Sequence, residues 1–128
     1  MTEFEITRNN ETEILRRTVE ALLAMPAATG IDVDDGDDEY ALYRSTDFEA
    51  IKDACFAVDE CYLFTNTIDG KRQYVYFIWG NGNNGLDAIT DYTVGLKEAL
   101  KPVNDWIEQR EWAYNGFQLT VDTSTANR

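Results

Sequence analysis

The chain contains no histidine among its 128 residues, and histidine is the side chain that most often transfers protons or binds zinc at neutral pH. Ser-His-Asp catalysis, Cys-His catalysis and histidine-ligated zinc sites are therefore excluded. The two cysteines, Cys55 and Cys61, are six residues apart, between a predicted helix and a predicted strand, and this spacing does not match a metal site. We expect buried free thiols, with a disulfide as the alternative.

Carboxylates are the chemical groups that the sequence supplies in excess. There are 24 Asp and Glu residues against 11 Lys and Arg, which gives a net charge of −13 at pH 7. Two carboxylates can hydrolyse a glycosidic bond, but nothing in the sequence selects such a pair. We predict that the protein is not an enzyme and has no catalytic residues, no metal site and no cofactor. An anionic surface repels nucleic acids and anionic lipids, so the expected partner is a basic protein surface.

The acidic residues are concentrated in one segment. Residues 32–60 contain eleven acidic and two basic residues, a net charge of −9, whereas the other 99 residues carry a net charge of −4. Solubility alone requires a net charge of about 2–8 in magnitude with interspersed signs, so it does not explain this concentration. Like charges so close together also repel one another, which disfavours the folded state.

Four interpretations of residues 32–39 remain open. A calcium-binding EF-hand loop beginning at Asp32 fails because Gly36 stands at position 5 and Tyr43 at position 12, which leaves only an irregular divalent-ion site. The second interpretation is a solvated loop tip, and the third is adaptation to high salt. The fourth is an interaction surface whose carboxylates take the place of nucleic-acid phosphates in a basic groove of a partner. Alternation along a strand would put Asp32 and Asp34 on one face, about 6.5–7 Å apart.

A loop rich in glycine and asparagine follows Trp79, a possible aromatic anchor. Residues 80–85 match the G-x-G-x-x-G string of dinucleotide-binding proteins, but the acidic residue expected about 20 positions later is Asp105, within a predicted helix. We therefore interpret this segment either as a flexible connection at the sheet edge or as a contact loop. The predicted partner-binding residues belong to the acidic segment and to this loop: Asp32, Asp34, Asp35, Asp37, Asp38, Glu39, Asp47, Glu49, Asp53, Trp79, Asn81, Asn83 and Asn84.

The spacing of apolar residues predicts an α+β fold, with a mainly antiparallel sheet of about five or six strands and about three helices packed on it. The hairpin of residues 62–64 and 74–79, joined at Asp69-Gly70, is apolar on both faces and is expected at the centre of the sheet. The predicted helices are residues 11–25, residues 47–58 after a Thr46/Glu49 capping box, and a segment from Asp91 that either kinks at Pro102 or forms two short helices meeting there. The other predicted strands are residues 4–8, 31–34, 40–44 and 112–121.

The length is typical of one domain, and we predict a single domain over residues 1–121 with a flexible tail at residues 122–128. Residues 1–5 are acidic where a signal peptide is basic, and no apolar run approaches the roughly 20 residues that a membrane span needs. We expect a cytoplasmic protein, monomeric or homodimeric, without a membrane partner.

In size and strong acidity the chain resembles small acidic proteins of phages and mobile elements, which include anti-restriction DNA mimics and anti-CRISPR proteins. The resemblance covers the whole chain by composition and contains no diagnostic motif. It implies inhibition of a host nuclease or of a CRISPR or restriction complex in the host cytoplasm, through its nucleic-acid channel and without a cofactor. Such proteins share no single fold, so no site residue follows from it. An immunity protein or antitoxin that neutralises a basic toxin is the alternative, because it uses the same electrostatics.

Overall fold

The computed structural model describes residues 2–26, 28–66 and 71–122, with the backbone alone for Asn66 and residues 115–122. Its helices are α1 (Glu3–Leu23), α2 (Phe48–Phe56) and α3 (Lys101–Asp122). Its strands are β1 (Ile31–Asp34), β2 (Leu42–Ser45), β3 (Glu60–Asn66), β4 (Arg72–Ile78) and β5 (Ile89–Tyr92). Short 3-10 helices lie at η1 (Asn83–Gly85) and η2 (Val94–Leu96).

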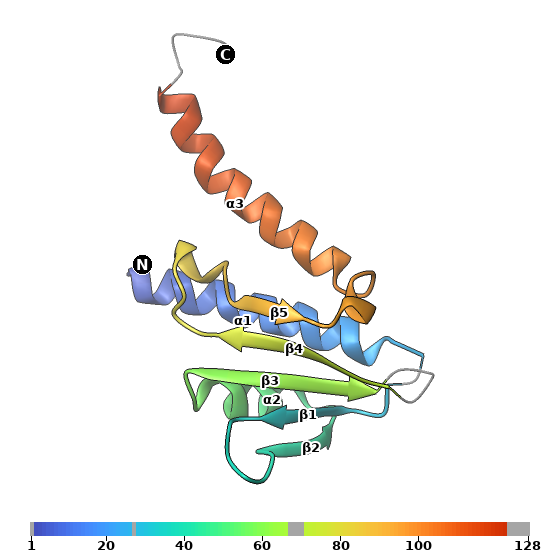
Figure 1. Ribbon diagram of the computed structural model, residues 1–128. Helices are drawn as coiled ribbons and strands as arrows, with labels where there is room; N and C mark the ends of the chain where they lie inside the picture. Colours follow the sequence, from blue (N-terminus) through green and yellow to red (C-terminus); the bar gives the residue numbers. More distant parts are fainter. Residues whose placement is uncertain (1, 27, 67–70, 123–128) are drawn as a thin grey trace.

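Within the described ranges, the strands form one antiparallel sheet of five strands in the order β2-β1-β3-β4-β5. The predicted α+β class is therefore confirmed, and β3 occupies the middle of the sheet as expected for the central hairpin. The helices α1 and α2 lie behind the sheet in Figure 1, and α3 extends away from it beyond β5. One layer of helices thus covers one face of the sheet.

Every second side chain of the inner strands points toward the helices. Ile31 and Val33 of β1, Leu63 of β3 and Val75 of β4 are all 0% exposed. They pack against the apolar stripe of α1 and against α2, in a core that buries these further residues: Ile14, Leu15, Val19, Leu22, Ile51, Cys55, Cys61, Phe77, Trp79, Leu86, Ala88, Leu96, Leu100 and Val103. Because strand side chains alternate, the residues between them face the opposite side of the sheet.

The first helix begins earlier than the sequence predicted. The hydroxyl of Thr2 accepts a hydrogen bond from the backbone N–H of Glu5, and the Glu5 carboxylate accepts one from the N–H of Thr2. This capping box satisfies backbone N–H groups that have no partner within a helix and starts α1 at Glu3. The predicted strand at residues 4–8 is therefore wrong, because the local cap outweighs the short alternation of Phe4 and Ile6.

The predictions around α2 are correct in kind and shifted by a few residues. Asp47 is the N-cap of α2, and its side chain accepts the N–H of Glu49 at 3.0 Å, so a single Asp47 cap takes the place of the predicted Thr46/Glu49 box. The return strand of the first hairpin is β2, which begins at Leu42 instead of residue 40. The expected Asp69-Gly70 turn lies outside the described residues.

The C-terminal third differs most from the prediction. Instead of a helix from Asp91, the chain forms β5 and η2, and α3 begins only at Lys101. Pro102 is the second residue of α3, where its missing N–H would have had no helical acceptor, so the predicted kink is wrong. The predicted strand at residues 112–121 is also wrong, because α3 continues through it to Asp122. Residues 123–128 of the predicted tail lie outside the described residues.

The loop of residues 80–85 packs against the first half of α1. Gly85 has a φ of +83°, and a Cβ atom built there would come 2.5 Å from the backbone oxygen of Thr7. Only glycine combines this conformation with so close an approach. The loop leads through η1 into β5 and not into the long helix that a dinucleotide-binding loop would open. Gly85 therefore serves packing against α1.

We predict that Gly85→Ala lowers the free energy of unfolding by about 2–4 kcal/mol, because the left-handed backbone and the overlap with Thr7 both add strain. The matched control is Gly82→Ala, since Gly82 also has a positive φ, of +42°, but has no atom within 4 Å of the added Cβ. Urea unfolding of both variants measures the difference. Equal losses in the two variants would contradict the role of close packing.

Candidate partner-binding face

The face of the sheet turned away from α1 and α2 carries rows of aromatic and acidic side chains. Strand pairing aligns one row in the order Asp34, Tyr62, Tyr76 and Asp91. It aligns the neighbouring row in the order Asp32, Phe64 and Tyr74. Asp32 and Asp34 therefore share a face, as predicted. Among the described elements, no helix covers this side of the sheet (Figure 1).

Six rings form a continuous layer on this face. The rings of Tyr62 and Tyr76 stack with centroids 4.5 Å apart, and those of Tyr40 and Phe64 stack at 5.8 Å. We call the layer the aromatic face, and its members are Tyr40, Tyr43, Tyr62, Phe64, Tyr74 and Tyr76. Tyr43 is 63% exposed, and the other five rings are half-buried. β3 and β4 thus have one buried apolar face and one half-exposed face rich in tyrosine, which refines the prediction that the hairpin is apolar on both faces.

Arg72 occupies one end of the aromatic face. Its guanidinium carbon lies 4.6 Å from the ring centroid of Phe64 and 5.4 Å from that of Tyr40, and its Nη2 is 2.8 Å from Oδ2 of Asp32. Partial burial lowers the pKa of Arg72, but hydrogen bonds to Asp32 and Tyr40 raise it by more, so the net pKa lies above its ordinary value. The predicted partner-binding residue Asp32 is therefore already paired within the chain.

A second group of carboxylates and rings lies on the same face, beside the first residues of β3. Asp34, Asp35 and Glu60, with the rings of Tyr62 and Tyr76, line a hollow of about 100 Å³, which we call the acidic hollow. The hydroxyl of Tyr76 donates a hydrogen bond to Glu60, and desolvation together with this bond raises the pKa of Tyr76. In the part of the chain that the structure describes, no Lys or Arg forms an ion pair with the three carboxylates.

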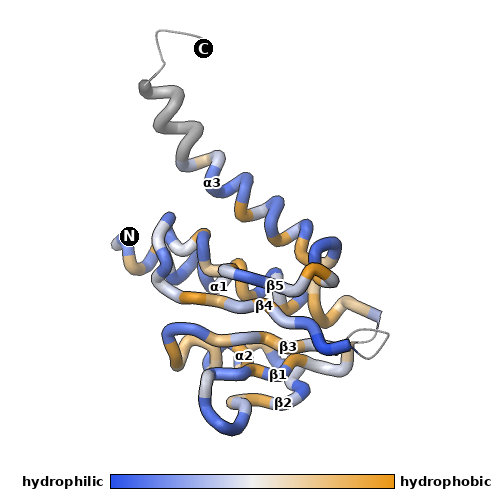
Figure 2. Tube along the Cα trace, in the orientation of Figure 1, coloured by the Kyte–Doolittle hydropathy of each residue, from blue (hydrophilic) through white to orange (hydrophobic). Residues whose placement is uncertain are grey.

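The loop between β1 and β2 carries further charge beside this hollow. Oδ1 of Asp34 accepts the N–H of Gly36 at 2.9 Å, and Oδ1 of Asp35 accepts the N–H of Asp37 at 3.2 Å, so two carboxylates shape the turn. The next acidic residues, Asp37, Asp38 and Glu39, are exposed. Figure 2 shows this loop as the hydrophilic turn at the lower left. The loop thus extends the negative charge of the sheet face into solvent.

The predicted partner-binding residues of α2 lie on the other side of the sheet. α2 packs on the covered face through Ile51 and Cys55, away from the aromatic face. Asp47 caps the helix, and Glu49 pairs with Lys52 at 2.9 Å, while Asp53 is exposed. The acidic segment is continuous in sequence, but the fold divides its charge between two surfaces.

Trp79 belongs to the core and is not an exposed anchor. Its side chain is 8% exposed, its Nε1 donates to the backbone oxygen of Cys55 at 2.8 Å, and its ring stacks on Phe77 with centroids 4.9 Å apart. This burial corrects the prediction that Trp79 presents a contact surface beside the loop. The ring fills the space between β4 and α2, where it also meets Phe56 edge-on.

The three asparagines of the loop are exposed, and the side-chain amides of Asn81 and Asn83 and the backbone of Asn84 also form hydrogen bonds. Asn83 donates to the carboxylate of Glu111 on α3 at 2.5 Å, and Asn81 donates to the backbone oxygen of Asp87 at 3.3 Å. The backbone oxygen of Asn84 accepts a hydrogen bond from the side chain of Asn10 at 2.9 Å. The loop therefore ties α1 to α3, and it does not join the aromatic face.

A buried carboxylate holds the start of this loop. Glu11 is 1% exposed, its Oε2 accepts the backbone N–H of Gly80 at 2.5 Å, and its Oε1 lies 3.7 Å from Nε of Arg8. Burial raises the pKa of Glu11 more than the bond from Gly80 and the charge of Arg8 lower it. The pKa of Glu11 in the folded state therefore lies above its ordinary value.

Both cysteines are free and buried, as predicted. A hydrogen bond with Cys61 and burial raise the pKa of the Cys55 thiol, so it remains protonated. A buried protonated thiol is a poor nucleophile. The pair therefore serves the core.

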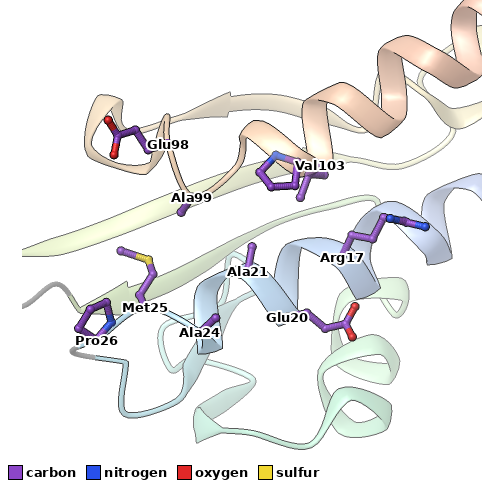
Figure 3. A pocket seen from close by; sticks show the side chains of 10 residues that line it. Arg17, Glu20, Ala21, Ala24, Met25, Pro26, Glu98, Ala99 and Val103 are labelled. Carbon is purple, nitrogen blue, oxygen red and sulfur yellow. The ribbon is translucent and has the colours of Figure 1, made fainter.

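A groove of about 700 Å³ lies between the end of α1 and the start of α3. Its centre is lined by small apolar side chains, including Ala21, Ala99 and Val103. Figure 3 shows its two carboxylates, Glu20 and Glu98, at opposite ends and pointing away from one another. The groove thus lacks the alternation of rings and carboxylates found on the aromatic face.

The sequence analysis missed the rings and part of the charge on this face. Tyr62, Tyr74 and Tyr76 are hydroxyl-bearing residues that alternate with the purely apolar Leu63 and Val75. This alternation is the signal for a half-exposed strand face. Glu60, Arg72 and Asp91 become visible as members only through the strand register, which brings together residues distant in sequence.

Residues 2–26, 28–66 and 71–122 offer neither a metal-binding cluster nor a membrane-spanning helix. These ranges contain no group of three or more Cys, Asp or Glu residues arranged to hold a metal ion. Their helices lack the length and apolar character needed to cross a membrane. Comparison with known protein families, with curated proteins and with solved structures finds no match to this chain.

We predict that Glu11→Gln changes how stability depends on pH. Because the folded-state pKa of Glu11 is raised, its contribution is fully present below the ordinary pKa and is lost as the pH rises through the raised value. Glutamine keeps an acceptor for the N–H of Gly80 and does not titrate. From about pH 4 to pH 7, the wild type should therefore lose unfolding free energy relative to the variant.

Urea unfolding across this pH range gives the free energy of unfolding of each protein. The contributions of the other acidic residues cancel in the difference between the two proteins. Glu20→Gln controls for the loss of one negative charge, since Glu20 is exposed on the same helix. A difference between wild type and Glu11→Gln that stays constant, or that grows in favour of the wild type, would show that Glu11 does not titrate as argued.

Proposed function

We propose that the protein is a non-enzymatic inhibitor that binds a basic surface of a nucleic-acid-handling protein in the cytoplasm, in the manner of anti-restriction or anti-CRISPR proteins. The observation that carries the proposal is the uncovered sheet face, on which Asp34, Glu60 and Asp91 stand among aromatic rings beside the acidic β1–β2 loop. A basic channel built for phosphates would meet these carboxylates on one exposed face of the sheet.

The distribution of charge supports recognition at a distance as well as at contact. A net charge of −13 steers a basic partner toward the protein. Asp37, Asp38 and Glu39 are exposed and lie in the middle of the loop that joins β1 to β2. The same charge repels nucleic acid, so the protein would compete with DNA or RNA for the partner and would not bind them. Competition with nucleic acid is therefore the property to test.

We predict that reversing the loop charges, with Asp37→Lys, Asp38→Lys and Glu39→Lys together, weakens partner capture and leaves thermal stability equal or higher. The three side chains are exposed and self-repulsion falls when they are reversed. The protein, immobilised in a bacterial lysate at about 50 and 200 mM salt, should retain a nuclease or nucleic-acid-binding complex that excess duplex DNA displaces. Mass spectrometry identifies the retained proteins.

The matched control reverses Glu20, Glu98 and Glu108, which are also exposed but lie on α1, before α3 and on α3. This control changes the net charge by the same amount and should keep the partner. If both triple variants lose the partner equally, net charge alone explains binding. A single basic partner that DNA does not displace would instead indicate an immunity protein or antitoxin.

A further inference from the structure

We infer that the aromatic face binds arginine side chains of its partner, with the acidic hollow as the site that receives one guanidinium group. This inference rests on the proposed function for the identity of the partner. The argument for arginine rests on the rings and carboxylates of the face. The occupant is an arginine-bearing basic segment of another protein. The surface offers it carboxylates as acceptors and tyrosine rings as stacking planes.

Arg72 supplies the internal example of this recognition. Its guanidinium group lies over two rings, those of Phe64 and Tyr40, while one of its nitrogens reaches the carboxylate of Asp32 at 2.8 Å. A planar guanidinium can stack and donate hydrogen bonds at the same time, because its donors lie in the plane of the group. The row of Asp32, Phe64 and Tyr74 is therefore already occupied by an arginine of the chain itself.

The acidic hollow repeats these ingredients without a cation. Two stacked rings, Tyr62 and Tyr76, stand beside the carboxylates of Asp34, Asp35 and Glu60. Within the described ranges no Lys or Arg pairs with these carboxylates, whereas Asp32 in the neighbouring row has Arg72. The hollow thus combines the acceptors and the ring planes with an uncompensated negative charge.

The geometry favours arginine over lysine. An ammonium group is a compact, strongly hydrated charge that does not stack, and it gains less from a pair of ring faces than a guanidinium does. Both cations gain equally from the net negative charge. A difference between them therefore reports on the rings and not on the overall field.

The charge of the face argues against stacking of nucleic-acid bases. Aromatic residues on an open sheet can stack bases, but such surfaces bind the phosphate backbone with basic residues. Here the neighbours of Tyr62 and Tyr76 are Asp34, Asp91 and Glu60. A phosphate drawn along these rings would meet carboxylates, so a basic polypeptide is the occupant that the charges fit.

The test uses two short peptides, one in which arginine alternates with glycine and a matched one with lysine in place of arginine. Isothermal titration calorimetry gives their affinities for the full chain, and amide NMR shifts locate the binding. The arginine peptide should bind about five- to tenfold tighter than the lysine peptide, since stacking on the rings adds to the same charge attraction. The largest shifts should fall on β3, β4 and the start of the β1–β2 loop.

Three variants localise the preference. Tyr76→Leu removes one ring of the hollow and should bring the two affinities together, whereas Tyr76→Phe keeps the ring, removes the hydroxyl that bonds to Glu60 and should keep the preference. Trp112→Leu is the matched control, because Trp112 is an exposed ring on α3, outside the aromatic face. Circular dichroism and thermal unfolding of each variant establish that it is folded, and a misfolded Tyr76→Leu is replaced by Tyr62→Leu.

Equal affinities for the two peptides, a preference that survives loss of the ring in the hollow, or tighter binding of a single-stranded oligonucleotide would each overturn the inference. The peptide titration contains no nuclease, so it tests the arginine site independently of the proposed inhibitor function. An arginine preference without a DNA-displaced partner keeps the arginine site and removes the inhibitor function. A DNA-displaced partner without an arginine preference keeps the function and removes the arginine site.

Discussion

The two-residue alternation of the inner strands is the constraint on which both sides of the molecule depend. Because successive side chains of a strand point to opposite faces, the inward placement of Leu63 and Val75 fixes Tyr62 and Tyr76 outward. A slip of one residue would bury Asp34 and expose its apolar neighbour, so the hydrophobic core holds the register that aligns the outer rows. Core stability and the geometry of the partner-binding face therefore have the same origin.

Carboxylates and tyrosines on the outer face stabilise each other's positions. The hydroxyl of Tyr74 donates to Asp91 at 3.0 Å, and the hydroxyl of Tyr76 donates to Glu60. These bonds hold the carboxylates among the rings, although the excess negative charge favours their separation. Groups fixed in this way before binding lose less conformational entropy when a partner arrives. The rings thus give a strongly charged surface a defined shape.

The fold class and the central hairpin were predictable because strong patterns carry them, such as the apolar runs of β3 and β4. The start of α1 was also encoded, in the Thr2/Glu5 capping box. The alternation of Phe4 and Ile6 with polar residues indicated a strand instead. The β5 and η2 segments were not predictable from periodicity. Leu96 and Leu100 keep helical spacing, but they enter the core from the short helix η2 and from the turn before α3. The acidic hollow needed the strand register, because its residues come from separate segments.

The loop and the hollow would act over different ranges in the proposed complex. Exposed loop carboxylates attract a basic partner across solvent, an effect screened beyond about 8 Å at physiological salt. In the hollow, a guanidinium group in contact with Tyr62 and Tyr76 would lie within that distance and partly out of water. Added salt should then lower the association rate more than it lowers the preference for arginine over lysine. Charge concentrated in one loop and rings arranged on one sheet are accordingly two separable contributions, the first to the rate of encounter and the second to the choice of residue.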